Sequence, residues 1–279
     1  MNHFSIEELK NKVQSLKKKL IDLTYQTGGA YLAQALSGVD LMAALFYRYL
    51  KYDPLKPNWE ERDRFLLSPG HYALLLYTIL ADLGYFDPKL LSTFKENNSP
   101  LELISHRHTL PGVEISGGSL GQVLSVGVGM ALHAKLRKKK HRIFVMMSDG
   151  EQNEGQIWEA ATSAVHFKLN NLVALIDKNG FQVDGPTKEV MNMEPLGDKY
   201  RVFGWEVEEV NGHNIAEIVA ILDKFSLKRE KPFLLIGNTV RGKGISFLEN
   251  SLNFHYTRLN KILKDKASYE LIGDWDAEM

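Results

Sequence analysis

Two apolar runs of strand type in this sequence are each followed by side chains that bind metal ions well. The first run precedes Asp149 and Gly150, and the second precedes Asp177 and Asn179, which lies 30 residues beyond Asp149. Carboxylate and amide oxygens are ligands that Mg²⁺ and Ca²⁺ take in proteins, with phosphate oxygens of a bound ligand completing the shell. Gly150 has no side chain, so its backbone can approach a phosphate closely. This spacing predicts a cation and phosphate site where two parallel strands end.

A purely structural explanation of these residues is also open. Asp-Gly and Asn-Gly pairs are common in ordinary turns, because both side chains bond to their own backbone and glycine tolerates positive φ. The prediction of a site therefore depends on the elements that place the two turns relative to each other.

The chain around these turns has the pattern of alternating helices and strands. Ser5 and Glu8 form a capping-box pair, and the apolar stripe that follows predicts an N-terminal helix. Continuous apolar strands separated by helices indicate an α/β domain with a mostly parallel sheet covered by helices on both faces. Further helices are expected over about 38–50, up to 83, 120–139, 156–167 and 215–225; strands over 64–67, 143–147, 172–176, 206–210 and 233–237; and a loop over 97–118.

The domain organisation that we predict is one diphosphate-binding α/β domain over residues 1–279. It has a helical N-terminal segment over about 5–60 and a short C-terminal tail over about 251–279.

The composition excludes several classes of chemistry and partner. The chain has no cysteine, which excludes disulfides, thiol nucleophiles, zinc-thiolate sites and iron-sulfur clusters. The 34 basic and 34 acidic side chains balance, so there is no overall attraction to nucleic acid or to an anionic membrane. No apolar run reaches the roughly 18 residues that span a bilayer, and the first residues lack the features of a signal peptide. We expect a cytoplasmic protein.

Segments spread over nearly the whole chain resemble the N-terminal part of transketolase, in the order of that family. The stretch from Asp149 to Asn179 resembles the diphosphate and magnesium signature of thiamine diphosphate enzymes. The other segments that carry the resemblance are residues 38–46, 53–54, 62–71, 112–114, 118–122, 154–155, 158–161, 184–187 and 242–247.

The resemblance implies a cofactor, thiamine diphosphate with Mg²⁺ (or Ca²⁺), and a role for several residues. Asp149, Asn179 and the backbone carbonyl of Phe181 would hold the metal ion. The diphosphate would contact the backbone of Gly150 and the side chain of His71, and the rest of the cofactor-binding set is Gly118, Leu120, Asp177, Val183 and Asn238. Gly118 and Leu120 would border the aminopyrimidine, Val183 the thiazolium side, and Asp177 would support the site.

Two of these predictions have catalytic character. Glu154 resembles the family glutamate that connects the two cofactor sites, and we assign it with His71 as catalytic. The alternatives are a helix-start histidine with its hydrogen bonds satisfied, and a carboxylate that the helix dipole favours at an N-terminal turn.

Several positions depart from the family pattern. Tyr31 stands where transketolases have a histidine that faces the substrate, Asn238 replaces another histidine, and Arg241 replaces a lysine. Neither tyrosine nor asparagine titrates near neutrality as histidine does. The diphosphate and metal positions are kept, whereas positions that handle the donor's hydroxyl groups and protons have changed. This pattern favours cofactor binding with a specialised sugar substrate.

His106 or His108 is open as a substitute for another family histidine after a small loop shift. Six further histidines are not assigned to the site: His3, His133, His141, His166, His213 and His255. None, including His255, shows metal-ligand spacing, and His213 is expected to have a local capping role before a helix.

The resemblance implies the N-terminal subunit of a split enzyme. A second chain would carry the pyrimidine-binding and C-terminal domains in an α₂β₂ assembly, and the pair would transfer a two-carbon ketol unit from a ketose or ketose phosphate to an aldehyde or carbonyl acceptor.

Two alternatives are the alpha subunit of a 2-oxoacid dehydrogenase, which residues 118–122 and 242–247 disfavour, and a non-catalytic regulatory paralogue. The intact metal positions argue against the latter, and the lost histidines argue for it.

Overall fold

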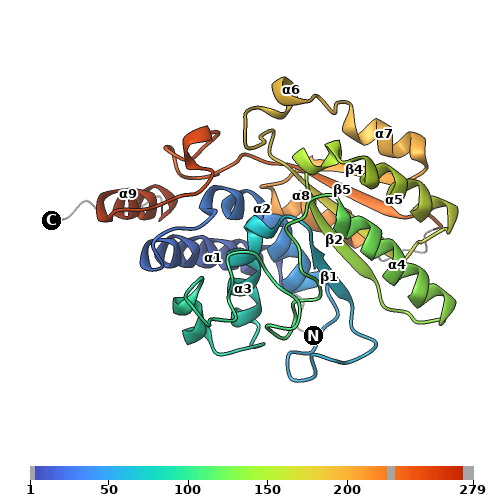
Figure 1. Cartoon of the computed structure of the whole chain (residues 1–279), viewed down its shortest axis with the longest axis horizontal. Coiled ribbons are helices and arrows are strands. Elements are labelled where there is room, and N and C mark those ends of the chain that lie inside the picture. The colour runs from blue at the N-terminus through green and yellow to red at the C-terminus, as the bar shows by residue number, and fades with distance from the viewer. Residues whose placement is uncertain (1–3, 225–229, 273–279) are drawn as a thin grey trace.

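A five-stranded sheet is the centre of the computed structural model, which describes residues 4–224 and 230–272 (Figure 1). The strand order is β1-β2-β3-β5-β4, and every neighbouring pair runs parallel. The strands are β1 (Arg64–Leu67), β2 (Ile143–Ser148), β3 (Leu172–Lys178), β4 (Glu206–Asn211) and β5 (Phe233–Asn238). The predicted α/β class and parallel sheet are confirmed.

Helices cover both faces of this sheet, as Figure 1 shows, with α1, α2, α3 and α8 on one face and α4, α5 and α7 on the other. Alternate residues of a strand point to opposite faces. In β2, Phe144 and Met146 join one hydrophobic core, and Val145 and Met147 join the other. The helices are α1 (Ile6–Gln26), α2 (Leu32–Ala44), α3 (Ala73–Asp82), α4 (Gln122–Leu136), α5 (Gly155–His166), α6 (Thr187–Val190), α7 (Leu196–Phe203), α8 (Ile215–Lys224) and α9 (Lys261–Ile272).

Helix α1 begins where the capping pair predicts. The Ser5 backbone N–H donates to Glu8 Oε2 at 2.7 Å, and the Glu8 N–H donates to Ser5 Oγ at 3.2 Å. One stripe of the helix, including Leu9, Val13 and Leu20, is buried. The sequence therefore predicts this helix correctly from its cap and its periodicity.

Two helix boundaries differ from the prediction. Helix α2 begins at Leu32 instead of residue 38, because all of its residues are buried and no amphipathic pattern marks its start. Helix α4 begins at Gln122, since Gly121 before it has a φ of 82° that a helix cannot contain. The last residue of the helix predicted over 215–225 lies outside the described residues.

Two regions without predicted structure contain helices. The turn-rich stretch before β4 contains α6 and α7. The region from 251 onward, which we expected to be a short tail, contains α9 packed along α1, where Lys264 pairs with Asp22 at 3.2 Å and Ala267 is buried. Ala267 is the only buried side chain between residues 261 and 271, because the sequence of α9 lacks the apolar stripe that predicts a packed helix.

Within residues 4–224 and 230–272, none of the helices combines the length and the apolar character needed to cross a bilayer.

Candidate functional site

A cavity of about 260 Å³ lies beside the ends of β2 and β3. Seven of the residues predicted from the sequence line it: His71, Leu120, Gly150, Glu154, Asn179, Phe181 and Val183. Parallel strands end at one edge of a sheet, and ligands of open α/β folds bind there. The cavity therefore has the position that the sequence predicts for the site.

The two turns that carry the predicted metal ligands are hydrogen-bonded to each other. Asp149 is 4% exposed, and its Oδ2 accepts the N–H of Gly180 at 2.7 Å, while its Oδ1 accepts the N–H of Gly150 at 2.8 Å. Asn179 Oδ1 accepts the N–H of Phe181 at 3.0 Å. Burial raises the pKa of the Asp149 carboxyl to about 7, although these backbone donors oppose the shift. A bound cation would favour the ionised carboxylate.

Asp177 lies beneath this cavity and does not line it. The carboxylate is fully buried and accepts hydrogen bonds from Ser37 Oγ at 2.9 Å, from Thr239 Oγ1 and from Tyr72 OH. Burial raises the pKa of the Asp177 carboxyl. The three hydroxyl donors come from α2, from the 3₁₀ turn at Gly70–Tyr72 and from the turn after β5, so this carboxylate connects three segments. Its role in supporting a cofactor site stays a prediction.

Gly118 brings the loop before α4 against the loop that carries His71. Its N–H donates to the Ser68 carbonyl at 2.9 Å, and its φ is 98°. A Cβ atom at this position would lie 2.7 Å from Cγ2 of Ile104, closer than side chains pack. Only glycine fits here without displacing Ile104.

Glu154 and Asn238 differ in their relation to the cavity. Glu154 lines it from the N-terminus of α5 and is exposed, a position that the helix dipole favours for a carboxylate. Asn238 is not among the lining residues; it is exposed at the end of β5, and its Nδ2 donates to the Val210 carbonyl at 3.4 Å.

Sequence reasoning missed a group of three side chains at one end of the cavity. His255 Nδ1 lies 2.9 Å from Gln34 Nε2 and 3.2 Å from Arg241 Nη2. Both partners are donors, so Nδ1 accepts and the proton of the neutral ring is on Nε2. Gln34 and His255 are 221 residues apart and follow no spacing rule, so no sequence signal brings them together.

Aromatic rings enclose this end of the site. Tyr31 packs edge-on against His71 with ring centres 5.8 Å apart, and against His255 and Tyr256 with ring centres 5.3 Å apart. Burial lowers the pKa of His71 to about 3, and the proximity of His255 and Arg241 acts in the same direction. His71 is therefore a neutral imidazole that can donate or accept one hydrogen bond.

Glu151 is another buried carboxyl that sequence reasoning missed. Its Oε1 accepts from Ser68 Oγ at 2.8 Å, and burial raises its pKa to about 7. It connects the His71 loop to the turn after β2.

Polar atoms without partners gather around the cavity. Among the described residues, eight buried side-chain nitrogen or oxygen atoms have no hydrogen-bond partner, and four belong to residues that line this cavity: Gln34 Oε1, Asn153 Oδ1, Gln182 Nε2 and Arg241 Nε. Each unpaired buried polar atom costs about 1–3 kcal/mol. This set of donors and acceptors, near the side-chain oxygens of Asp149 and Asn179, fits a polar ligand with a metal-bound diphosphate.

Comparison with known proteins identifies the fold and the family. The family described as "Transketolase, thiamine diphosphate binding domain" matches residues 9–270. Solved transketolases from Campylobacter jejuni and Pichia stipitis both superpose with a TM-score of 0.88, at 30% and 27% identity. They are covered over 43% and 41% of their length, so the chain spans about two fifths of these enzymes, while 97% and 96% of this chain is matched.

Two curated relatives have a length similar to that of this chain. The 6-deoxy-6-sulfo-D-fructose transketolase subunit SqwG of Clostridium sp. (strain MSTE9) is 38% identical over 95% of this chain and 96% of its own length. An apulose-4-phosphate transketolase subunit of Phocaeicola vulgatus is 37% identical over 90% of this chain and 89% of its own length. This chain belongs to the transketolase family and corresponds to its thiamine diphosphate-binding domain.

Proposed function

We propose that this chain is the thiamine diphosphate-binding subunit of a transketolase-like enzyme that transfers a two-carbon ketol unit from a ketose or ketose phosphate to an aldehyde or carbonyl acceptor. The observation that carries the proposal is the pair of turns after β2 and β3. The Gly180 N–H donates to Asp149 Oδ2 and so joins the two turns, and Asn179, next to Gly180, lines a cavity that also has unpaired polar atoms.

The residues at the strand ends would hold the cofactor. Asp149, Asn179 and the carbonyl of Phe181 bind the cation, which we propose is Mg²⁺, with Ca²⁺ as the alternative of the same ligand chemistry. The backbone of Gly150 contacts the diphosphate, and a Cβ there would lie 3.1 Å from Gln182 Cγ, so the absent side chain leaves room. Thiamine diphosphate supplies a nucleophilic carbon and an electron sink for breaking and forming carbon-carbon bonds next to a carbonyl.

Other residues orient the cofactor and exclude water. Gly118, Leu120 and Val183 border its rings, and Asp177 keeps the turns beneath it in place. Neutral His71 holds a proton at one ring nitrogen for a hydrogen bond, and Glu154 offers a carboxylate at the mouth of the cavity. Asn238 lies outside the cavity, so any contact with the cofactor would need the loop after β5 to move.

The partner in this proposal is a second chain that carries the pyrimidine-binding and C-terminal domains, in an α₂β₂ assembly in the cytoplasm. The solved transketolases extend well beyond the matched part, and two relatives of matching length are named as subunits. Val183 lines the cavity and is 62% exposed, as expected if a partner covers the site.

The substrate in this proposal is a specialised sugar or sugar phosphate. The names of the two relatives refer to 6-deoxy-6-sulfo-D-fructose and to apulose-4-phosphate. Tyr31, which the resemblance places where the family has a histidine, packs against His71 and His255. The proposal is that this replacement changes which sugar the site accepts.

Reconstitution with a candidate partner chain tests the proposal. The pair with thiamine diphosphate and Mg²⁺ should convert ketose donors, and the isolated chain or the pair treated with a chelator should not. Turnover by the isolated chain would contradict the split enzyme. Turnover of 2-oxoacids instead of ketoses would favour a dehydrogenase alpha subunit, and failure of the pair to bind thiamine diphosphate would favour a regulatory paralogue.

A further inference from the structure

The loop between β4 and α8 carries His213, whose ring bonds to two other parts of the fold. Its Nδ1 lies 3.1 Å from Asp40 Oδ2, and its Nε2 lies 2.8 Å from the backbone nitrogen of Val240. A backbone N–H can only donate, so Nε2 accepts. The proton of the ring is therefore on Nδ1, which donates a hydrogen bond to Asp40 Oδ2. The local capping role that we expected belongs to Asn214, whose Oδ1 accepts the N–H groups of Ala216 and Glu217 at 3.1 and 3.3 Å.

A buried ion pair fixes the orientation of this imidazole. Asp40 in α2 is 4% exposed, and Lys17 in α1 is 7% exposed with its Nζ 3.7 Å from Asp40 Oδ2. A buried carboxylate held by a cation cannot swing away from Nδ1, so it selects the tautomer that leaves Nε2 free to accept. Carboxylates select the tautomer of ligating histidines in metal sites in the same way.

The partner of Nε2 lies at the centre of the turn that supplies two residues to the site. Thr239 donates to the buried carboxylate Asp177, and Arg241 lines the cavity beside His255. Backbone hydrogen bonds anchor this turn at two points. The N–H of Thr239 donates to the Lys178 carbonyl at 3.0 Å, and the N–H of Gly242 donates to the Ala33 carbonyl at 2.8 Å. Between these two anchors, Val240 is held by the histidine side chain.

The two loops can approach because of a glycine. A Cβ atom on Gly212 would lie 2.4 Å from Thr239 Cγ2, so only glycine lets the loop of His213 pack against the turn after β5.

We propose that His213 is a positioning residue of the cofactor site: its neutral imidazole accepts the Val240 N–H and so fixes the turn that holds Thr239 on Asp177 and Arg241 in the cavity. The role in cofactor binding rests on the proposed function. The role in holding the turn rests on the geometry alone, and the two are tested separately.

Three variants separate the hydrogen bonds of the ring from its bulk. His213→Gln keeps a donor for Asp40 and an acceptor for Val240. His213→Leu removes both at similar volume. His213→Asn, whose amide reaches Asp40 but is too short for Val240, replaces His213→Leu if that variant does not fold. His166→Leu, an exposed histidine on α5, is the control.

Hydrogen exchange of the peptide that contains Val240, measured on the full chain without cofactor, tests the positioning role. We expect His213→Leu and His213→Asn to exchange this amide about tenfold faster, the loss of one hydrogen bond, and His213→Gln to match the unmodified chain. Unchanged exchange in His213→Leu, or in His213→Asn where it takes its place, would overturn the proposal.

Affinity for thiamine diphosphate with Mg²⁺, measured by titration of the reconstituted pair, tests the consequence. We expect about tenfold weaker binding in His213→Leu or His213→Asn, recovery in His213→Gln, and kcat at saturating cofactor within about twofold of the unmodified pair. If the unmodified pair binds and these variants bind equally well, the positioning role fails while the function stands. If the unmodified pair does not bind, the function fails, and the exchange experiment still decides the role of His213.

Discussion

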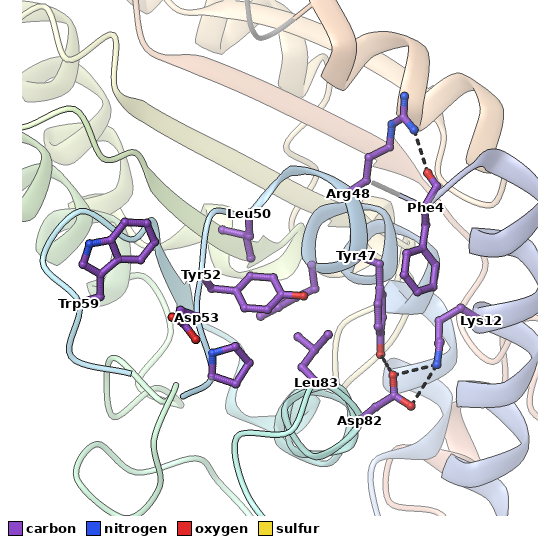
Figure 2. Close-up of a pocket in the computed structure, with 12 residues that line it drawn as sticks. Phe4, Lys12, Tyr47, Arg48, Leu50, Tyr52, Asp53, Trp59, Asp82 and Leu83 are labelled. Carbon is purple, nitrogen blue, oxygen red and sulfur yellow. Dashed lines mark hydrogen bonds and ion pairs between the residues drawn. The ribbon is translucent and has the colours of Figure 1, made fainter. Parts of the chain in front are cut away.

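Two cavities of this molecule differ in how their polar groups are satisfied. The larger, about 600 Å³, lies between α1, the turn of π-helix at Leu45–Tyr49 and the end of α3 (Figure 2). Several of its polar groups have partners within the chain: Asp82 accepts from Lys12 at 2.9 Å and from Tyr47 OH at 2.6 Å, and Arg48 donates to the Phe4 carbonyl at 2.8 Å.

The smaller cavity, about 260 Å³, has the opposite character. Four buried polar atoms around it lack partners, and Arg241 is buried without an ion pair to any carboxylate among the described residues. Volume alone would select the larger cavity as the binding site. The unpaired polar atoms favour the smaller one. Such atoms destabilise the fold, so we expect them where a bound ligand completes their hydrogen bonds.

The largest effect that separates the two cavities should come from Asp149→Ala. Removal of the carboxylate that we propose binds the cation should weaken thiamine diphosphate binding with Mg²⁺ by more than about 100-fold, or about 2.7 kcal/mol, in the reconstituted pair. Isothermal titration with and without Mg²⁺ measures this effect.

The carboxylate also accepts two backbone N–H groups, so a second variant separates its charge from its structural role. Asp149→Asn keeps the volume and one acceptor but not the charge, and it should also lose most of the dependence on Mg²⁺. Cofactor affinity unchanged in both variants would remove Asp149 from the site.

Asp82→Ala in the larger cavity should change stability and not binding. Tyr47 and Lys12 would lose their acceptor, which should lower the free energy of unfolding by about 1–3 kcal/mol. Urea unfolding of the chain measures this loss. A fall in cofactor affinity comparable to that of Asp149→Ala would show that the two cavities are coupled and would break the contrast between them.

The sequence predicts the half of the site that lies on strand ends. Asp149 and Asn179 follow apolar runs, and their distance along the chain corresponds to two neighbouring parallel strands, so a local pattern carries their geometry. Glycines such as Gly118 are similarly readable, because a positive φ or a close approach leaves one residue type.

The other half of the site depends on tertiary packing. Gln34 lies on a helix buried on all sides, and His255 lies in a region expected to be a tail, so neither has a periodicity that indicates a shared cavity. The sequence marks Arg241 only as a replacement for lysine, and its burial follows from the turn around Val240. Helix α9 is missed for the same reason, since it packs along α1 with Ala267 as its only buried side chain between residues 261 and 271, and so it has no apolar stripe.

Gln182→Met tests whether an unpaired atom of the smaller cavity is kept for a ligand. Gln182 Nε2 has no partner, so its removal should leave the free energy of unfolding unchanged or up to about 1 kcal/mol higher, while cofactor affinity falls about threefold to tenfold. Urea unfolding without cofactor and titration of the reconstituted pair measure the two quantities. A loss of stability with unchanged affinity would mean that the side chain serves the fold.

The smallest expected effect is the absence of a titration at His71. With a pKa of about 3, the ring should remain neutral between pH 5 and 8, and its NMR signals should not shift over that range.

In the unfolded chain the same ring has a pKa of about 6.5, so the unfolded state takes up a proton first as the pH falls. The free energy of unfolding should therefore decrease as the pH falls below about 6.5, and His71→Gln should remove this part of the dependence. A His71 signal that titrates near pH 6 would show that the surroundings of this ring are more polar than a pKa of about 3 indicates. It would weaken the contrast between the two cavities.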